Sequence, residues 1–275
     1  MTRLGIREAL NGAQALGLAR LDAQLLMLHA LNKPDTDRAW LLAHDQDLLD
    51  GKAVDDFRAI SQRRADGEPL AYITGFKDFF GLRFSVDKRV LVPRPDTETL
   101  VQWALDVLQG IRSPDALDLG TGSGAVAIAI AHQLQCTVSA TDFSAEALAV
   151  AAGNALRLGV DLRCLQSSWF DNVVGHFHLI ASNPPYIADA DPHLAALTHE
   201  PINALTSGAD GLKDIRQIVQ QAPGYLQAGG WLILEHGYDQ AASVRGLLLK
   251  RGFQQVQSRM DLANNERCSG GQWPN

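Results

Sequence analysis

The sequence predicts an α/β protein, in which a doubly wound, mostly parallel sheet follows a small helical region. Between residues 115 and 251, short apolar segments alternate with longer segments of helical character. This alternation indicates a parallel sheet with helices on both faces. In residues 1–75, leucines recur at helical spacing, and the sequence there contains no glycine loop or ligand cluster.

The chain divides into three expected parts. Residues 1–75 are expected to form a helical domain that docks a substrate, because they carry helical periodicity but no chemical motif. Residues 76–95 are expected to form a linking β-hairpin, because apolar and polar residues alternate around the turn-like Asp87-Lys88. Residues 96–275 are expected to carry the sheet.

The expected elements follow the hydrophobic pattern. The predicted strands are 115–120, 137–142, 162–166, 177–182 and 231–235, and the predicted helices are 16–31, 39–44, 53–65, 125–134, 144–159, 213–226 and 239–251. Ligands of such sheets bind beyond the carboxyl ends of the strands. The residues that directly follow strands are therefore the candidate site.

The composition favours a cytoplasmic protein without membrane association or bound metal. The 275 residues are 46% hydrophobic and 20% charged, which suits one large and one small domain. Neither a secretory leader nor an apolar run of about 18 residues is present. The three cysteines are far apart, which argues against a disulfide framework and a thiolate zinc site.

The charge distribution argues against direct nucleic-acid binding. Residues 1–89 hold 13 basic and 13 acidic side chains, so the net charge of −7 lies entirely after residue 89. A duplex-binding protein usually shows a basic footprint, because neutralising phosphates supplies most of its affinity. The sequence does not determine the oligomeric state, for which we favour a monomer.

A glycine-rich loop follows the first predicted strand of the sheet. Its residues are Gly120, Thr121, Gly122, Ser123 and Gly124. Glycines permit a tight turn and let backbone N–H groups approach a ligand. The spacing differs from that of dinucleotide-binding and Walker-type loops. A purely structural turn is the alternative interpretation.

An acidic residue, Asp142, ends the second predicted strand of the sheet. An acid at this position can accept both hydroxyls of an adenosine ribose. It could instead cap the helix that follows, but Ser144 can serve as that cap. Loop and acid together do not distinguish NAD from S-adenosylmethionine.

The sequence Asn183-Pro184-Pro185-Tyr186 directly follows the fourth predicted strand. Two prolines hold the backbone extended and remove two donors, which leaves the carbonyls of Asn183 and Pro184 as free acceptors. Two acceptors beside an aromatic ring suit a planar –NH2 group. An ordinary Asn-Pro turn is the alternative.

These motifs resemble those of methyltransferases that act on planar nitrogens, namely N6-adenine DNA methyltransferases and protein-glutamine N5-methyltransferases. The segment 91–98 (LVPRPDTE), preceded by 73–77, is similar to the second group, and within it to the peptide chain release factor glutamine methyltransferases. Further matches are Asp191-Pro-His193, Glu200-Pro-Ile-Asn-Ala-Leu205, Leu234-Glu-His-Gly237 and Asn265-Glu-Arg267. A sister group that acts on a ribosomal protein usually reads Pro-Arg-Ser-Pro where this chain has Pro-Arg-Pro-Asp, which favours a release factor.

The resemblance implies a class I S-adenosylmethionine-dependent methyltransferase fold with a seven-stranded sheet. S-adenosyl-L-methionine would be the methyl donor and S-adenosyl-L-homocysteine the product. The substrate would be a class 1 release factor, methylated at N5 of the glutamine in its Gly-Gly-Gln motif. The alternatives are glutamine methylation of a ribosomal protein and N6-adenine methylation of a nucleic acid.

The resemblance also implies roles for individual residues. The cofactor-binding residues would be Gly120, Thr121, Gly122, Ser123, Gly124, Asp142, Trp169 and Asn183. Asn183, Pro184, Pro185 and Tyr186 would bind the substrate, and Asn183, Pro184 and Tyr186 would take part in catalysis.

Two features depart from the family pattern. Ser168 precedes Trp169 where relatives commonly have an acid, so the hydrogen bond to adenine would be neutral and weaker. The end of the chain, 268–275, is expected to form a poor last strand because two glycines interrupt it. Its Gly270-Gly271-Gln272 repeats the substrate tripeptide by coincidence. A metal site at His176 and His178 is disfavoured, since no third ligand lies nearby in sequence.

Overall fold

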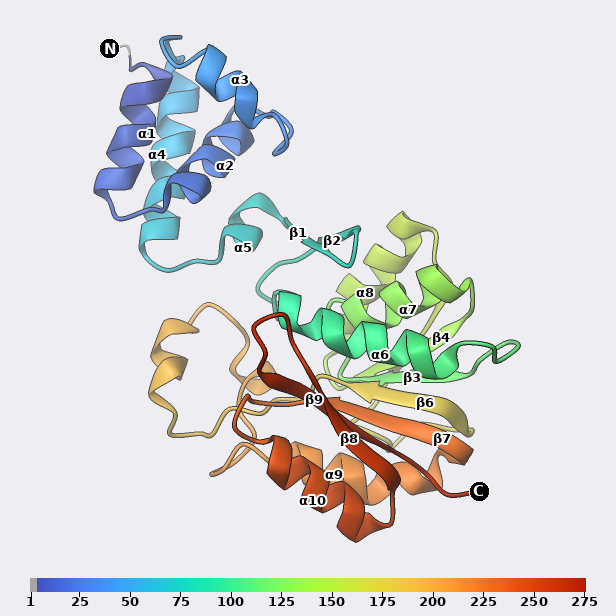
Figure 1. Cartoon of the computed structure of the whole chain (residues 1–275). Coiled ribbons are helices and arrows are strands. Elements are labelled where there is room, and N and C mark those ends of the chain that lie inside the picture. The colour runs from blue at the N-terminus through green and yellow to red at the C-terminus, as the bar shows by residue number, and fades with distance from the viewer. Residues whose placement is uncertain (1–3) are drawn as a thin grey trace. The chain divides into compact units, whose positions relative to one another are not determined.

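The computed structural model describes residues 4–275, and the chain divides between Phe76 and Lys77 into two compact units (Figure 1). In the smaller unit, the helices are α1 (Ile6–Ala15), α2 (Arg20–Ala30), α3 (Arg38–Ala43), α4 (Gly51–Ala65) and α5 (Leu70–Thr74). They enclose a core of their own, to which Leu26, Met27 and Phe57 contribute buried side chains.

The helix predicted over 16–31 is present as α2 but is shorter, since Leu16 and Leu18 precede it and Leu31 follows it. Helix α1, which lies before it, has no counterpart among the predicted helix ranges. The first helix ends at Ala15, and Gly17 turns the chain with φ of 93°. A positive φ is available to glycine at no steric cost, which explains the break between α1 and α2.

A short hairpin follows, formed by β1 (Phe76–Phe79) and β2 (Leu82–Ser85). Its turn is Phe80-Gly81, with φ of 48° and 75°. Two central residues with positive φ form the tight turn that matches the twist of paired strands. The hairpin was predicted to turn around Asp87-Lys88, which is wrong, since these residues come after β2; they begin a separate turn in which the Val90 N–H donates to the Asp87 carbonyl at 3.1 Å.

The larger unit is built on a seven-stranded sheet of order β5-β4-β3-β6-β7-β9-β8. Its strands are β3 (Ala116–Leu119), β4 (Val138–Asp142), β5 (Leu162–Gln166), β6 (Phe177–Ser182), β7 (Leu226–Glu235), β8 (Gln254–Met260) and β9 (Glu266–Gln272). The pairs from β5 to β7 are parallel, whereas β9 is antiparallel to both neighbours. The predicted doubly wound, mostly parallel seven-stranded sheet is confirmed.

Helices cover both faces of this sheet. The helices α6 (Glu98–Leu108), α7 (Ala125–Leu134) and α8 (Ala145–Leu158) lie on one face, and α9 (Lys213–Gln221) and α10 (Ala241–Arg251) lie on the other (Figure 1). The central strands β3 and β6 are buried almost throughout, because helices cover both of their faces. The carboxyl ends of these strands are thereby fixed side by side.

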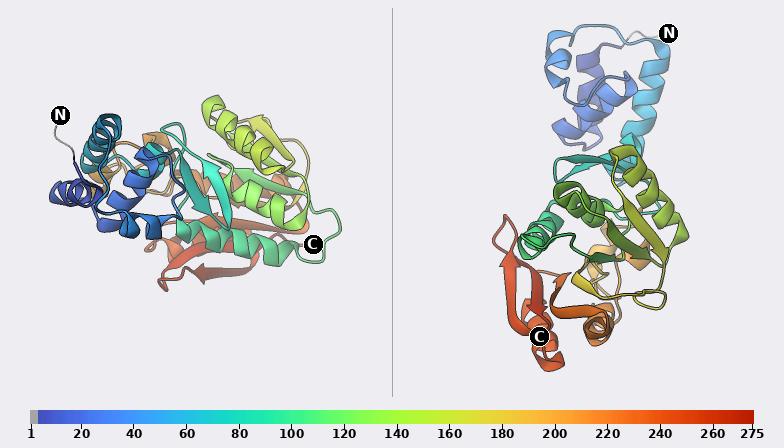
Figure 2. Two further views of the ribbon diagram at one scale, coloured as in Figure 1. Left: turned by 90° about the horizontal axis from the view of Figure 1, so that it is seen from above. Right: turned by 90° about the vertical axis from the view of Figure 1, so that its right-hand side faces the viewer.

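The last strand corrects the expectation drawn from its glycines. Strand β9 pairs with β7 and β8, beside the C-terminus (Figure 2). A Cβ at Gly270 would lie 2.7 Å from the carbonyl oxygen of Leu232, and one at Gly271 would lie 2.9 Å from Cβ of Phe253. The glycines are therefore needed for close packing, and the prediction of a poor strand is wrong.

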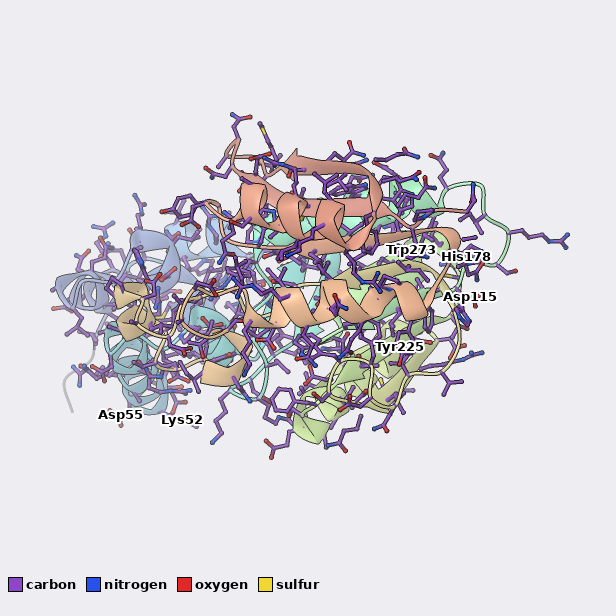
Figure 3. The ribbon with its side chains drawn as sticks, turned by 90° about the horizontal axis from the view of Figure 1, so that it is seen from below. Lys52, Asp55, Asp115, His178, Tyr225 and Trp273 are labelled. Carbon is purple, nitrogen blue, oxygen red and sulfur yellow. The ribbon has the colours of Figure 1, made fainter. Side chains whose placement is uncertain are left out.

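His176 lies directly before β6, and His178 lies within it. His178 Nδ1 accepts a hydrogen bond from the Asp115 backbone amide at 3.1 Å and lies 3.8 Å from its carboxylate (Figure 3). Within residues 4–275, no group of three or more His, Cys, Asp or Glu side chains is placed to hold a metal ion.

Candidate active site

A cavity of about 380 Å³ lies at the carboxyl ends of β3, β4 and β6, within Lys77–Asn275. This volume is in the range of small-molecule sites. The predicted site residues that line it are Gly120, Thr121, Gly122, Ser123, Asp142, Trp169, Asn183 and Pro185. Three other predicted residues, Gly124, Pro184 and Tyr186, do not line this cavity.

The glycine loop joins β3 to α7 through backbone that only glycine adopts easily. Gly120, Gly122 and Gly124 have φ of 71°, 55° and 83°. A Cβ at Gly124 would lie 2.8 Å from Ile128 Cδ1 and 3.3 Å from Ala151 Cα, so this glycine lets α7 and α8 pack closely. At Gly122 the space around a Cβ is open, and this glycine lines the cavity.

The loop amides are used differently from the sequence expectation. The N–H of Thr121 donates to the carbonyl of Thr141 at 2.8 Å, and the N–H of Gly122 donates to Asp142 Oδ2 at 2.9 Å. These two amides therefore tie the loop to the end of β4. Both N–H groups already have protein acceptors, so they are not directed at a ligand.

Asp142 lies at the end of β4 and is 7% exposed. Its second oxygen, Oδ1, accepts the N–H of Ser144 at 2.9 Å. Burial raises the pKa of Asp142, against the backbone hydrogen bonds that lower it. Each carboxylate oxygen retains a lone pair for a further donor in the cavity. The predicted helix cap is confirmed, since Ser144 Oγ accepts the N–H of Ala147 at 3.1 Å.

Trp169 is fixed from two sides. Its ring lies 3.4 Å from the position of a Cβ on Gly120, and its Nε1 donates to Asp214 Oδ1 at 3.2 Å. Asp214, in the first turn of α9, is held in turn by Ser207 Oγ at 2.6 Å. Ser168 is exposed and also lines the cavity. A flat apolar surface beside the glycine loop results.

Strand register places Asn183 next to the glycine loop. Ser182 pairs with Leu119 on one side and with Leu234 on the other, and its Oγ donates to the Leu119 carbonyl at 2.7 Å. One residue further, Asn183 Nδ2 donates to Thr97 Oγ1 at 3.2 Å. Within residues 4–275, no hydrogen bond is made to the backbone carbonyl of Asn183 or Pro184.

Tyr186 points away from the cavity wall. Its hydroxyl donates to Glu235 Oε1 at 3.4 Å, and its ring packs against the core between the sheet and α9 and α10. Burial raises the pKa of Tyr186 far above its ordinary value. Gly211 approaches the Tyr186 carbonyl so closely that a Cβ there would lie 2.1 Å from the oxygen. Tyr186 is thus clamped in place.

Two residues that line the cavity, Asp118 and Phe143, were not predicted from the sequence. Asp118, buried on β3, accepts Thr121 Oγ1 at 2.6 Å and the Ala127 N–H at 3.2 Å, and burial raises its pKa to about 7. Phe143 follows Asp142, is 53% exposed and lines the cavity. An aromatic residue directly after a strand-ending acid is a signal that the sequence analysis missed.

Two ion pairs join segments far apart in sequence at this site. Buried Glu200 binds the guanidinium of Arg94 and accepts the N–H of Val92 at 3.1 Å. Arg267 lies 3.2 Å from both Asp96 and Asp261. The acid of the Pro-Arg-Pro-Asp segment therefore reaches the Asn-Glu-Arg segment of β9.

The comparison with family models covers most of the chain. Residues 5–75 match the PrmC N-terminal domain, and residues 97–261 match the methyltransferase small domain. A methyltransferase from Pyrococcus furiosus has a similar fold, with a TM-score of 0.55 and 18% identity over 79% of this chain and 99% of that one. The fold and the site together define a class I S-adenosylmethionine-dependent methyltransferase.

Curated relatives narrow this class. The release factor glutamine methyltransferase of Bordetella pertussis is 49% identical over 93% of this chain and 95% of its own length. The protein of the same name from Burkholderia pseudomallei is 48% identical over 95% and 94%. The chain belongs to the release factor glutamine methyltransferase family.

Proposed function

We propose that this chain transfers a methyl group from S-adenosylmethionine to N5 of the glutamine in the Gly-Gly-Gln motif of class 1 release factors. One observation carries the proposal. Asn183, with unpaired backbone acceptors beside it, opens into the same cavity as the glycine loop and Asp142. An amide-binding group and an adenosine-binding group thus share one site.

The residues of the cavity fit the cofactor. The open space at Gly122 and the flat Trp169 ring beside Gly120 suit a nucleoside, and Asp142 can accept hydrogen bonds from ribose hydroxyls. Phe143 offers a second exposed apolar surface. When bound, S-adenosylmethionine supplies a methyl group on a positively charged sulfonium.

The acceptor groups fit a glutamine amide. Its nitrogen is a weak nucleophile, because the lone pair is delocalised into the carbonyl. Asn183 Oδ1 and the Pro184 carbonyl would accept its two hydrogens and stabilise the positive charge that develops on nitrogen. Holding both hydrogens aligns the amide nitrogen with the methyl group of the cofactor, and such a near-attack geometry lowers the barrier to transfer. The nitrogen is acidic after methylation and releases its proton to water, so no strong base is required.

The smaller unit would dock the release factor. Its helices enclose a core without contributing to the cavity, all of whose lining residues lie between Lys88 and Asp214. If residues 1–75 are removed, cofactor affinity should persist while methylation of the full-length release factor collapses. Calorimetry and thermal unfolding check the truncated protein. Normal methylation by a folded truncated enzyme would contradict this role.

The remaining parts of the proposal are the cellular location of the chain, its oligomeric state and its lack of direct nucleic-acid binding. Within residues 4–275, none of the helices combines the length and apolar character that crossing a membrane requires. Release factors act in the cytoplasm, and a cytoplasmic enzyme is part of the proposal. The proposal also includes a monomer that binds no nucleic acid directly, and the second of these points agrees with the net charge of −7.

The test is methyl transfer from labelled cofactor to a panel of acceptors. The panel holds an unmethylated class 1 release factor, the same factor with its motif glutamine replaced by alanine, ribosomal proteins and adenine-containing DNA. Mass spectrometry should locate the label on the glutamine of the first acceptor alone. Label on a ribosomal protein or on DNA, with none on the release factor, would overturn the proposal.

A further inference from the structure

The orientation of the Asn183 amide decides whether it can accept a hydrogen bond from a substrate. The oxygen and nitrogen ends of an asparagine side chain have nearly the same shape but opposite hydrogen-bonding character. A neighbouring group must therefore determine which end faces the cavity. The contacts of Asn183 identify that group.

Thr97 is the neighbour that Asn183 contacts. Asn183 Nδ2 donates to Thr97 Oγ1 at 3.2 Å, although the two residues are 86 positions apart. Thr97 is 4% exposed, ends the short 3-10 helix Pro95–Thr97 and precedes α6. Although Thr97 lines the cavity, its low exposure holds its hydroxyl beside Asn183.

Glu235 is a second polar neighbour of the Thr97 hydroxyl. This residue ends β7 and is fully buried; burial raises the pKa of its carboxyl, whereas the Thr97 hydroxyl lowers it by favouring the charged form. Since a hydroxyl has one proton, Thr97 presents only lone pairs to Asn183. Asn183 therefore directs its NH2 group toward Thr97, and its Oδ1 lies on the side of the amide that faces away from Thr97.

Other residues hold Glu235 in position. The Tyr186 hydroxyl donates to its Oε1 at 3.4 Å, and the nearby guanidinium of Arg267 attracts its charge. Arg267 also pairs with Asp96, the residue before Thr97. Among residues 4–275, Glu235 Oε2 has no hydrogen-bond partner. A buried carboxylate with an unsatisfied oxygen is unfavourable for folding, so a functional role would explain why Glu235 is present here.

We propose that Thr97, with its hydroxyl held by the carboxylate of Glu235, positions Asn183 so that Oδ1 accepts the substrate amide. Thr97, which also lines the cavity, and Glu235, which does not, are then positioning residues that act through Asn183. This inference rests on the proposed glutamine methylation, whose acceptor grip it explains.

A double-mutant cycle tests it with the full chain, S-adenosylmethionine and an unmethylated release factor. Thr97→Val keeps the volume of the side chain and removes the hydroxyl, whereas Thr97→Ser keeps the hydroxyl. The valine variant should lose about 10- to 100-fold in kcat, because Asn183 loses its fixed orientation. The serine variant should stay within about 3-fold of wild type. The KM for the cofactor should change less than kcat in both.

The cycle with Asn183→Ala separates positioning from general damage. If Thr97 acts through Asn183, the double variant is no slower than Asn183→Ala alone, whereas independent effects multiply. Multiplying losses, or wild-type turnover in a folded Thr97→Val enzyme, overturn the inference. If the valine variant does not fold, Thr97→Ala takes its place. Failure of the proposed function looks different, because the wild-type enzyme then methylates no release factor glutamine.

Discussion

Backbone hydrogen bonds between adjacent segments hold the glycine loop and Asp142, whereas side chains from distant segments hold Asn183. We call residues 118–124, 142–144 and 169 the cofactor half of the cavity. We call Asn183–Tyr186, with Thr97 and Glu235, the acceptor half; of these residues, Thr97, Asn183 and Pro185 line the cavity itself. The loop amides of the cofactor half reach Thr141 and Asp142, one strand away. The acceptor half instead joins the segment before α6, the segment after β6 and the end of β7 through side chains.

This difference suggests a division of labour. Backbone contacts in the cofactor half tolerate many side chains, provided that the glycines and the acid remain. The acceptor half depends on the identity of each side chain, because a hydroxyl, a carboxylate and an amide must match as donors and acceptors. Substitutions in the first half should therefore affect binding, and those in the second half turnover.

The largest expected effect is that of Asn183→Ala. Removing the side-chain acceptor should lower kcat by roughly 10²–10³, as for other groups that stabilise developing charge. The fold should persist, since Asn183 is only half-buried and lines the cavity. Steady-state kinetics at saturating substrates measure the loss, with thermal unfolding as the control. Near-normal turnover in the folded variant would refute the amide grip.

The second expected effect is on cofactor affinity. Asp142→Ala removes a carboxylate that can bind ribose hydroxyls, and hydrogen bonds to charged groups contribute about 1.5–3 kcal/mol. Affinity for S-adenosylmethionine should therefore fall about 10- to 150-fold by calorimetry. The kcat at saturating cofactor should change less. Unchanged affinity would remove Asp142 from the cofactor half.

The two halves also differed in how far the sequence could predict them. The glycine loop, Asp142 and Asn183 follow strands whose apolar pattern is plain, so their meeting at one sheet edge could be expected. The roles of Thr97 and Glu235 depend on long-range contacts. Thr97 is 86 positions from Asn183 and 138 positions from Glu235. No local pattern encodes such contacts. The partners of the loop amides and the inward-facing Tyr186 hydroxyl were equally beyond local reasoning.

The glycines at 270 and 271 led to a wrong prediction for a related reason, because their role depends on contacts with distant residues. Glycines weaken an isolated strand, and on that ground 268–275 looked unsuitable. In the structure, Gly270 and Gly271 lie where the sheet and its coverings leave no room for a Cβ. The turn of the β1–β2 hairpin was likewise displaced, because Phe80 adopts a positive φ that its residue type does not suggest.

The next prediction concerns the pH dependence of the free energy of unfolding, to which one buried carboxyl group in each half contributes. Burial raises the pKa of Asp118 from 3.8 and that of Glu235 from 4.5, each to about 7. Between these values the folded state binds more protons than the unfolded state, so stability should fall as pH rises from about 4 to 7. Each group contributes a slope of at most about 1.4 kcal/mol per pH unit.

Substitution should separate the two contributions. Asp118→Asn and Glu235→Gln should each flatten the decline, whatever they do to stability at a single pH. Urea unfolding at pH 5, 6 and 7 measures the slopes, with wild type as the reference. An unchanged slope in either variant would show that the carboxyl concerned does not titrate in this range.

The smallest expected effect sharpens the assignment of Asp142. Ser144 caps α8 through its Oγ, which accepts the Ala147 N–H, and lies two residues from Asp142. Ser144→Ala should lower the free energy of unfolding by about 1 kcal/mol, the usual contribution of a helix cap. Cofactor affinity should remain that of wild type, because Asp142 would keep both of its backbone hydrogen bonds. If the affinity fell as far as in Asp142→Ala, both substitutions would act by loosening the start of α8. Direct recognition of the ribose by Asp142 would then be wrong, and calorimetry on the two variants side by side decides between these outcomes.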